Sequence, residues 1–318
     1  GVEQDYKQAV EWYKKSAEQG YAAAQFDLGN CYECGRGVDK DYRKAVEWYE
    51  RAAKQGNEKA KESLDKLLNP NITYEEQKEA ITDEYGVRYT KDGLKLISVP
   101  KDLEILTIKG VRYIKVGWRN VPYNSKSYTI KDETKVIAKN AFKGCRVLRS
   151  IVIPKGVAKI GSMAFNDCNN PTITCESPLF NVGDGILYSK EGELISCFST
   201  SKDVVIPKDV TKIGECAFAW CSFLRTVVIP DSVTEIGGGA FRGCDYLQTI
   251  EIPNSVTEIG AYAFSECRSL RSIVIPNNVT KIKDRVFWGC SSLQTIEIPE
   301  GVTEIGAYAF SECRSLRS

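Results

Sequence analysis

The chain of 318 residues is long for one compact core and fits two domains or one elongated repeat array. Its 43 Lys and Arg residues balance 42 Asp and Glu residues, so the net charge of +1 gives no field that would draw it to nucleic acid or an anionic membrane. The absence of His excludes Ser-His-Asp and Cys-His catalysis, H-E-x-x-H metal sites and imidazole pH switches. No apolar run approaches the roughly 20 residues of a membrane helix, and the sequence does not open on a secretory signal.

Residues 1–68 contain a repeat with an offset of 36 residues. The segments that begin at Val2 and Val38 both read V-x-x-D-Y-x-x-A-V-E-W-Y, with the apolar residues at helical spacing. Asp5 and Asp41 are expected N-caps, and a Gly follows each apolar stripe as a C-terminal stop. A second helix is expected in each copy, over about residues 21–34 and 57–68. The pattern therefore predicts two helical hairpins.

This region resembles the Sel-one-like repeats, a subfamily of the tetratricopeptide solenoids. The resemblance rests on D-Y-x-x-A-V-x-W-Y-x-x-x-A-x-Q-G and on L-G-x-x-Y-x-x-G from Leu28 to Gly35. The second copy has Asp65 in place of the Gly and Leu68 in place of the Tyr, so we expect it to close the array. Two units are few for a free-standing solenoid, so either further copies precede them or the helices dock on the C-terminal repeats. The resemblance implies an adaptor or assembly role.

A second repeat, with a period of 23 residues, occupies the C-terminal part of the chain. It is marked by Phe142, Phe165, Phe218, Phe241, Phe264, Phe287 and Phe310, with one longer step of 53 residues after Phe165. The unit reads V-T-x-I-G-x-x-A-F-x-x-C-x-x-L-x-x-I-x-I-P, in which the alternating Ile residues predict a short strand that ends at Pro. Because no unit can bury its apolar face alone, we expect stacked turns, each Phe on the next, and one continuous parallel sheet with strands ~4.8 Å apart.

The unit resembles the BspA-type leucine-rich repeat, which is built on L-x-x-I-x-I-P, over seven units from about Thr134 to Ser318. Ala138 and Lys283 replace the Gly after Ile in two units, so a left-handed backbone is not required there. The predicted fold is an α + β multidomain repeat protein. An N-terminal α-solenoid of TPR-like helix pairs is followed by a parallel β-solenoid of 23-residue leucine-rich repeats.

The predicted domain organisation has four parts. Helical repeats span 1–68, a connecting helix with a Thr73-x-x-Glu76 capping box spans 69–82, capping strands span 83–133, and leucine-rich repeats span 134–318. Hairpins are expected with Asp-Gly at 92–93 and Glu-Gly at 191–192, the latter within an insertion at about 176–203. The first hairpin and strands around 103–116 are expected to cover the open end of the stack. The sequence stops before an I-x-I-P strand is due, which predicts a sheet edge prone to self-association.

Cysteine is the residue type with the greatest potential for chemistry in this sequence, and the chain has twelve. Seven stand three residues after a repeat Phe, at Cys145, Cys168, Cys221, Cys244, Cys267, Cys290 and Cys313. We expect a buried column of reduced thiols, because side chains in one column neither suit disulfide geometry nor converge on a metal. Cys31-x-x-Cys34 is a weak candidate for redox or zinc chemistry, since no second C-x-x-C accompanies it. The sequence thus predicts no cofactor and no metal.

Glycine clusters and paired carboxylates give little support to catalysis. Gly237–Gly239 and Gly35–Gly37 lack the continuation of a phosphate-binding loop, so they are expected turn residues. Glu251 and Glu297 are expected two rungs apart, roughly 10 Å, on an open strand face. An enzyme would need an enclosed polar pocket that the repeat pattern does not predict, so we expect a noncatalytic protein.

The outward strand positions form the candidate protein-binding surface. The residues expected on the strands are Thr226, Val228, Thr249, Glu251, Ser272, Val274, Thr295 and Glu297. The residues expected just before the strands, at the strand entrances, are Arg149, Arg225, Gln248, Arg271 and Gln294. This mixture of hydroxyl, aliphatic and charged groups can recognise an extended polypeptide or another domain. The same pattern also fits a merely solvated sheet face supported by cross-strand Thr pairs.

The sequence therefore predicts a protein-binding repeat scaffold, with no nucleic-acid partner and no membrane span in this segment. The BspA-type resemblance implies a bacterial or protist surface protein that adheres to host or neighbouring cells, which favours a secreted or cell-surface location. The alternative is an intracellular adaptor or assembly scaffold. An adhesin predicts an export signal or anchor in the longer gene, whereas an adaptor predicts neither and thiols that stay reduced.

Overall fold

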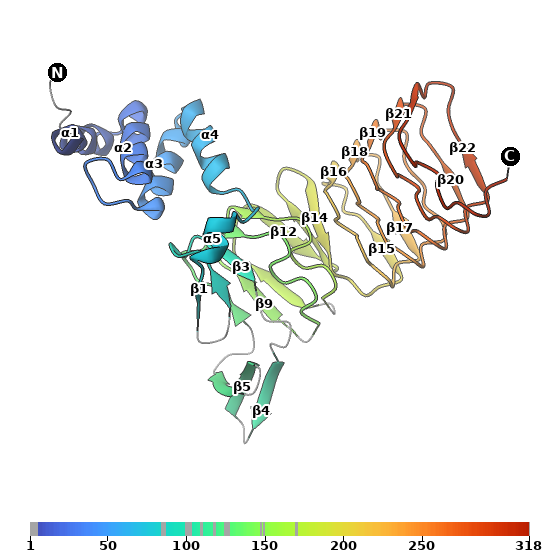
Figure 1. Ribbon diagram of the computed structural model, residues 1–318, viewed down its shortest axis with the longest axis horizontal. Coiled ribbons are helices and arrows are strands. Elements are labelled where there is room, and N and C mark those ends of the chain that lie inside the picture. Colours follow the sequence, from blue (N-terminus) through green and yellow to red (C-terminus); the bar gives the residue numbers. More distant parts are fainter. Residues whose placement is uncertain are drawn as a thin grey trace.

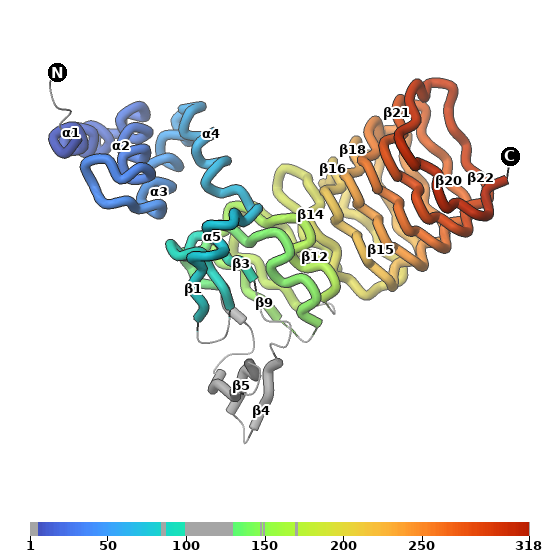
Figure 2. The backbone as a smooth tube through the Cα atoms, viewed as in Figure 1, coloured from blue at the N-terminus to red at the C-terminus, as the bar shows by residue number. Residues whose placement is uncertain are grey.

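The computed structural model describes residues 6–83, 87–98, 104–108, 111–116, 119–123, 128–146, 148, 150–168 and 171–317. Helices lie at the N-terminal end, and the stacked turns of a β-solenoid extend to the C-terminus (Figure 1). Figure 2 shows the later turns side by side along this row. The predicted order of a helical repeat unit followed by a parallel β-solenoid is confirmed.

The helical unit consists of two hairpins. Its helices are α1 (Tyr6–Glu18), α2 (Ala22–Cys34), α3 (Tyr42–Lys54) and α4 (Glu58–Leu67). The Asp41 side chain accepts a hydrogen bond from the Lys44 N–H as the N-cap of α3, and Asn57 accepts one from Ala60 N–H for α4. Asp5, the other predicted cap, lies outside the described residues. Gly29 lets α2 approach α3, because a Cβ there would lie 2.7 Å from the Tyr49 ring.

The helical unit docks on the β-solenoid through a shared apolar core. Val46 of α3 and Leu68, after α4, pack with Leu94 and Val136, all at most 4% exposed. Ion pairs flank this core, with Lys135 Nζ 3.1 Å from Glu50 Oε1 and Lys159 Nζ 2.6 Å from Asp65 Oδ1. The predicted capping box begins α5 (Tyr74–Lys78) between the two units. Docking therefore supplies the burial that two helical hairpins cannot provide alone.

Short strands build the first turns of the stack. β1 (Ile81–Thr82), β2 (Arg88–Tyr89) and β3 (Lys95–Ser98) are antiparallel, and β3 then pairs in parallel with β8 (Val136–Ile137), which pairs with β10 (Lys159–Ile160). A second parallel group contains β7 (Tyr128–Thr129), β9 (Ser150–Ile153) and β11 (Thr172–Cys175). A separate antiparallel sheet contains β4 (Glu104–Ile108), β5 (Val111–Val116) and β6 (Arg119–Tyr123). Leu103 lies outside the described residues, and capping by these three strands stays a prediction.

The insertion at about residues 176–203 continues the stack. It contains β12 (Phe180–Gly183), β13 (Ile186–Ser189) and β14 (Glu193–Cys197), which are antiparallel, so the predicted hairpin is present. β14 pairs in parallel with β16 (Lys212–Ile213), which joins the hairpin to the following turns. Phe198 lies edge-on to Phe165 at 6.4 Å between ring centroids, so an aromatic ring fills the core where the 23-residue step is interrupted.

The later turns contribute strands to two faces. The first face holds β16, β18 (Glu235–Ile236), β19 (Glu258–Ile259), β21 (Lys281–Ile282) and β23 (Glu304–Ile305). The second holds β15 (Asp203–Val205), β17 (Thr226–Val228), β20 (Ser272–Val274) and β22 (Thr295–Glu297). Between them the Phe rings stack as predicted, from Phe218 to Phe310, with neighbouring centroids 4.9–5.6 Å apart and planes at most 15° apart.

Two backbone features explain the repeat residues around each Phe. The residues two before and two after Phe264 are Tyr262 and Glu266, and both are left-handed, with φ of 61° and 63°. Gly260, after the Ile, is not left-handed; instead, a Cβ there would lie 2.4 Å from the Gly238 backbone nitrogen. Where Gly follows the Ile, it therefore allows close approach of successive turns rather than a left-handed φ.

The prediction of one continuous sheet is wrong on both faces. On the first face β16, β18 and β19 belong to one sheet, whereas β21 pairs with β23 in a separate sheet. On the second face the break lies at residues 249–251. β15 pairs with β17 and β20 pairs with β22, but residues 249–251 between them form no strand. In the described part of the chain, the only hydrogen bond between residues 225–229 and 248–252 joins Gln248 N to Arg225 O at 3.3 Å. The Phe stack continues at this level, since Phe241 lies 4.9 Å from Phe218 and 5.4 Å from Phe264. The turns thus stay packed at the Phe column while their strands separate on the second face.

Candidate protein-binding surface

The predicted binding residues lie together on the second face of the solenoid. Alternation along the strands buries Val227, Ile250 and Ile273, at 5%, 6% and 3% exposed, and turns their neighbours outward. The twelve predicted residues that the structure describes are all exposed: Arg225, Thr226, Val228, Gln248, Thr249, Glu251, Arg271, Ser272, Val274, Gln294, Thr295 and Glu297. Arg149 lies outside the described residues. We call these twelve residues the outer sheet face.

A cleft of about 270 Å³ opens on this face where the strands separate. Its walls are residues 226–229 of one turn and 249–251 of the next. Val228 stands 58% exposed on the first wall, and Glu251 on the second wall is the only ionisable side chain among the lining residues. The cleft therefore combines aliphatic surface, Thr hydroxyls, one carboxylate and the backbone groups that the interrupted ladder leaves open.

Two exposed aromatic residues beside the face were missed by the sequence prediction. Phe223 and Tyr246 are 53% and 57% exposed, two positions after the repeat Cys of neighbouring turns. The next three units have Ser269, Ser292 and Ser315 at this position. An aromatic residue at a repeat position that other units fill with Ser was the sequence signal that could have identified these two residues. Exposed aromatic residues beside Arg are the composition that dominates binding energy at protein interfaces.

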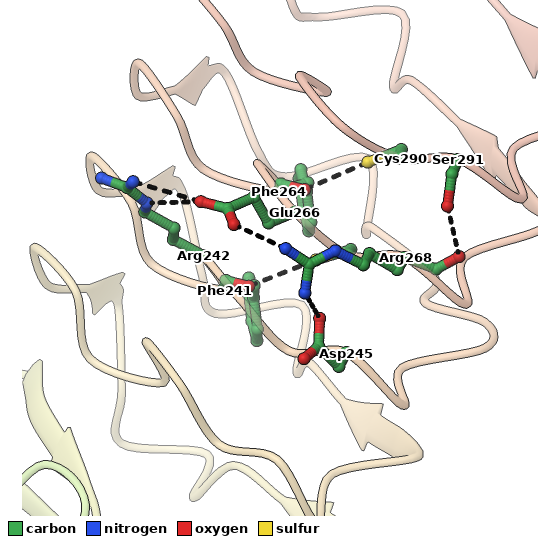
Figure 3. Close-up of polar contacts among 9 residues, drawn as sticks. Phe241, Arg242, Asp245, Phe264, Glu266, Arg268, Cys290 and Ser291 are labelled. Atoms are coloured by element: carbon green, nitrogen blue, oxygen red, sulfur yellow. Dashed lines mark hydrogen bonds and ion pairs between the residues drawn. The ribbon is translucent and has the colours of Figure 1, made fainter. Parts of the chain in front are cut away.

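The side of the solenoid formed by the Phe-to-Leu turns has its charges paired across neighbouring turns (Figure 3). Glu266, whose side chain is 13% exposed, accepts from Arg242 at 3.1 Å and from Arg268 at 2.9 Å. Arg268 also contacts Asp245 Oδ1 at 2.7 Å, which ties two turns together. Since each of these charges has a partner, this network serves stacking rather than recognition of a ligand.

The repeat cysteines are packing residues with a specific hydrogen bond. Cys267 Sγ donates to Phe241 O at 3.2 Å. Cys290 Sγ donates in the same way to Phe264 O at 3.1 Å, as Figure 3 shows. Burial raises the pKa of Cys168 to about 12 and raises that of Cys267 well above its ordinary value. All twelve cysteines are free thiols. The column is buried at Cys145, Cys168, Cys244, Cys267 and Cys290 and half-buried at Cys221 and Cys313, so the predicted burial is confirmed for five of the seven.

The other chemical candidates do not assemble into a site. Cys31 is buried with a raised pKa, chiefly from desolvation, and exposed Cys34 donates to Asn30 Oδ1 at 3.8 Å. Among the residues that the structure describes, no three His, Cys, Asp or Glu side chains are grouped so as to hold a metal ion. No described helix has the length and apolar character needed to cross a membrane.

The helical unit has its own hollow of about 730 Å³, between α1, the loop at residues 35–41 and α3. Lys7, Lys40 and Lys44 line it together with Asp39 and Asp41. Lys44 Nζ lies 3.5 Å from Asp41 Oδ2 and 5.3 Å from the centroid of the Tyr32 ring. Because positive and negative side chains share this hollow, its charge does not select a ligand class.

Two repeat families match the chain. The BspA type leucine rich repeat region matches residues 120–202 and 195–317, with six copies. The chain belongs to the BspA-type leucine-rich repeat family. The Sel1 repeat matches residues 1–21 and 22–57, which confirms the predicted resemblance of the helical unit. Both predicted families are thus shown, and both are repeat scaffolds.

Solved structures of bacterial proteins are similar to parts of the chain. A leucine rich cell surface protein from Faecalibacterium prausnitzii A2-165 shares 34% identity with a TM-score of 0.52, over 59% of this chain and 57% of that protein. A Sel1 repeat protein from Oxalobacter formigenes shares 47% identity over 21% of this chain and 28% of its own, with a TM-score of 0.21. The pneumococcal vaccine antigen PcpA shares 18% identity over 59% and 55%, with a TM-score of 0.39. The chain thus spans little more than half of the Faecalibacterium protein, and no curated protein matches it.

Proposed function

We propose that this BspA-type leucine-rich repeat chain is a noncatalytic scaffold that binds another protein through the outer sheet face. The observation that carries the proposal is the composition of this face. Arg225 and Arg271 form no ion pair among the described residues, exposed valines stand between them and the strand ends, and Phe223 and Tyr246 lie alongside. Several charged side chains elsewhere on the stack are paired across turns, as in the network of Glu266.

The occupant of this face is proposed to be an extended polypeptide or a folded domain of a host or neighbouring cell. Support for a secreted or cell-surface location comes from the family and from the Faecalibacterium relative, which is described as a cell surface protein. Reduced thiols are compatible with this location because Cys168, Cys244, Cys267 and Cys290 are buried and their pKa values are raised, which protects them from oxidation. The intracellular adaptor remains the competing proposal for the helical repeats.

The test combines a face variant with a matched control. Arg225→Ala, Arg271→Ala and Glu251→Ala together remove two positive charges and one negative charge from the face. The control Lys155→Ala, Lys208→Ala and Glu300→Ala removes the same charges from exposed loop positions that come directly after repeat prolines. We expect the face variant to lose at least tenfold in apparent affinity for cells to which the unaltered protein adheres, while the control binds normally. Equal binding by both variants would remove this face from the proposal.

Location is tested separately in the native organism. Antibody labelling of intact cells, compared with labelling of permeabilised cells, should detect the protein without permeabilisation. Signal that appears only after permeabilisation would favour the adaptor and overturn the surface location, whatever the binding variants show.

A further inference from the structure

The thiol of Cys221 makes a different contact from other thiols of the repeat column. Five repeat cysteines donate to the carbonyl oxygen of the Phe 26 residues earlier, at 3.1–3.2 Å: Cys168, Cys244, Cys267, Cys290 and Cys313. The residue at that distance before Cys221 is Ile195, which lies in the insertion. Cys221 Sγ lies instead 3.6 Å from Cys197 O. The insertion therefore places a second thiol-bearing residue beside a repeat cysteine.

Cys197 and Cys221 are not equivalent positions of neighbouring turns. Cys197 is the last residue of β14, whereas Cys221 follows the Phe of a repeat turn. Both pack in the same apolar cluster, but they reach it from different elements. The parallel orientation that disfavours a disulfide within the column therefore does not apply to this pair. Cys197 is 2% exposed and Cys221 is half-buried, so a small oxidant reaches the pair through Cys221.

Contact between the two thiols makes one of them more acidic. A side-chain hydrogen bond from Cys221 lowers the pKa of Cys197 against the effect of burial, and the same contact raises the pKa of Cys221. Elsewhere in the column burial raises the pKa, as it does at Cys244 and Cys290. Because the thiolate is the attacking species in thiol–disulfide exchange, Cys197 is better suited to attack a neighbouring sulfur than either of these.

The pair lies where two apolar cores of the solenoid meet. The Phe198 ring contacts Phe165 before it, and the next ring stack begins at Phe218. Cys197 packs in the core that continues to the C-terminal turns, whereas the adjacent residue Phe198 packs in the preceding core. We call residues 194–198 and 217–221 the joint. A covalent bond from Cys197 to Cys221 would tie the insertion to the first turn of the C-terminal core.

We infer that Cys197 and Cys221 form a reversible disulfide that locks the joint. The oxidant is a low-molecular-weight disulfide such as glutathione disulfide. Cys221, the accessible thiol, displaces one thiol from it to give a mixed disulfide, and Cys197 Sγ then attacks Cys221 Sγ and releases the second thiol. One S–S bond replaces two S–H bonds in the protein, and the two protons and two electrons leave on the two released thiols. The site shares no residue with the outer sheet face, so it is independent of the proposed function.

Peptide mapping tests the inference on the full chain. The reduced, folded protein is incubated with glutathione disulfide, its remaining thiols are alkylated during unfolding, and monomeric chains are digested without reductant. We expect Cys197 and Cys221 in one cross-linked peptide, the other repeat cysteines alkylated, and exposed Cys34 carrying at most a glutathione adduct. Cys221→Ser should leave Cys197 free, whereas Cys313→Ser, at another half-buried column position, should still form the bond. Circular dichroism confirms that each variant is folded.

Hydrogen exchange of the oxidised and reduced protein measures the locking of the joint. Residues 194–198 and 217–221 should exchange roughly tenfold more slowly after oxidation, and dithiothreitol should restore the original rates. Oxidation of Cys221→Ser should leave these rates unchanged. Alkylation of both thiols, a glutathione adduct that persists at Cys221, or a cross-link from Cys221 to Cys244 would overturn the pairing. A Cys197–Cys221 bond without slower exchange would overturn its role as a lock.

Discussion

Removing one ring from the centre of the Phe stack should destabilise the solenoid strongly. Phe264 is fully buried, with the Phe241 ring 5.4 Å away on one side and the Phe287 ring 5.6 Å away on the other. Because rings on both sides are themselves held in the stack, the cavity left by Phe264→Ala cannot collapse. Such substitutions cost about 3–5 kcal/mol. We expect a loss of this size, measured by guanidinium unfolding followed by circular dichroism.

Two further variants calibrate this result. Phe310 is only partly buried and has the Phe287 ring at 5.6 Å as its stacking partner, so Phe310→Ala should cost about half as much. Phe264→Leu keeps most of the volume and should cost less than about 1.5 kcal/mol. Since repeat arrays can unfold in parts, hydrogen exchange of individual turns accompanies the unfolding curves. A loss below about 1 kcal/mol for Phe264→Ala, or a larger loss for Phe310→Ala, would refute the stacking argument.

Packing and pairing in the fold lead to three other expected outcomes. Exposed Cys34 should react with a thiol reagent in the native protein, whereas buried Cys267 should react only after unfolding; native labelling of both at one rate would contradict the buried column. Gly260→Ala should lower the free energy of unfolding by about 1–3 kcal/mol, because its Cβ would lie 2.4 Å from Gly238 N. The control Gly183→Ala, whose Cβ would have nothing within 4 Å, should be near neutral. Equal unfolding midpoints for the two variants would disprove this reason for the repeat Gly. Burial alone would raise the pKa of Glu76, but its bonds to Lys95 and Thr73 hold it below the ordinary value, so this carboxylate stabilises the fold at neutral pH and loses that effect as pH falls through its folded pKa. Melting temperatures between about pH 6 and pH 3 should therefore vary less in Glu76→Gln, and an unchanged pH profile would count against the pairing.

Local sequence rules were sufficient for the helical unit and the repeat core. Asp41 and Asn57 cap helices in the structure because each precedes an apolar helical stripe and supplies a short side-chain acceptor. Thr73 caps the short α5 through its capping box with Glu76. The 23-residue Phe period likewise fixed the ring stack, since only equivalent positions of neighbouring turns can meet. These features depend on residues within one or two units, which the sequence displays directly.

Features that depend on several units at once were not predictable in the same way. The interruption at residues 249–251 has the same T-I-E sequence as paired strand β22, so its cause lies in the neighbouring turns rather than in its own residues. The docking of Val46 and Leu68 on Leu94 and Val136 was one of two alternatives, the other being further helical copies before residue 1. The sequence could not decide between them, because an apolar position does not reveal which residues it packs against. The cleft beside Glu251 lies at that interruption. The sequence therefore placed the candidate residues together on one face but could not predict that a cleft lies among them.

The most direct measurement of the binding account is a hydrogen-exchange footprint of the chain with and without its bound partner. Protection should appear in the peptides covering residues 225–229, 248–252, 271–275 and 294–298. The first-face strands β18, β19 and β21 should exchange as in the free protein. Protection confined to the first face or to the helical unit, with the outer sheet face unchanged, would contradict the account.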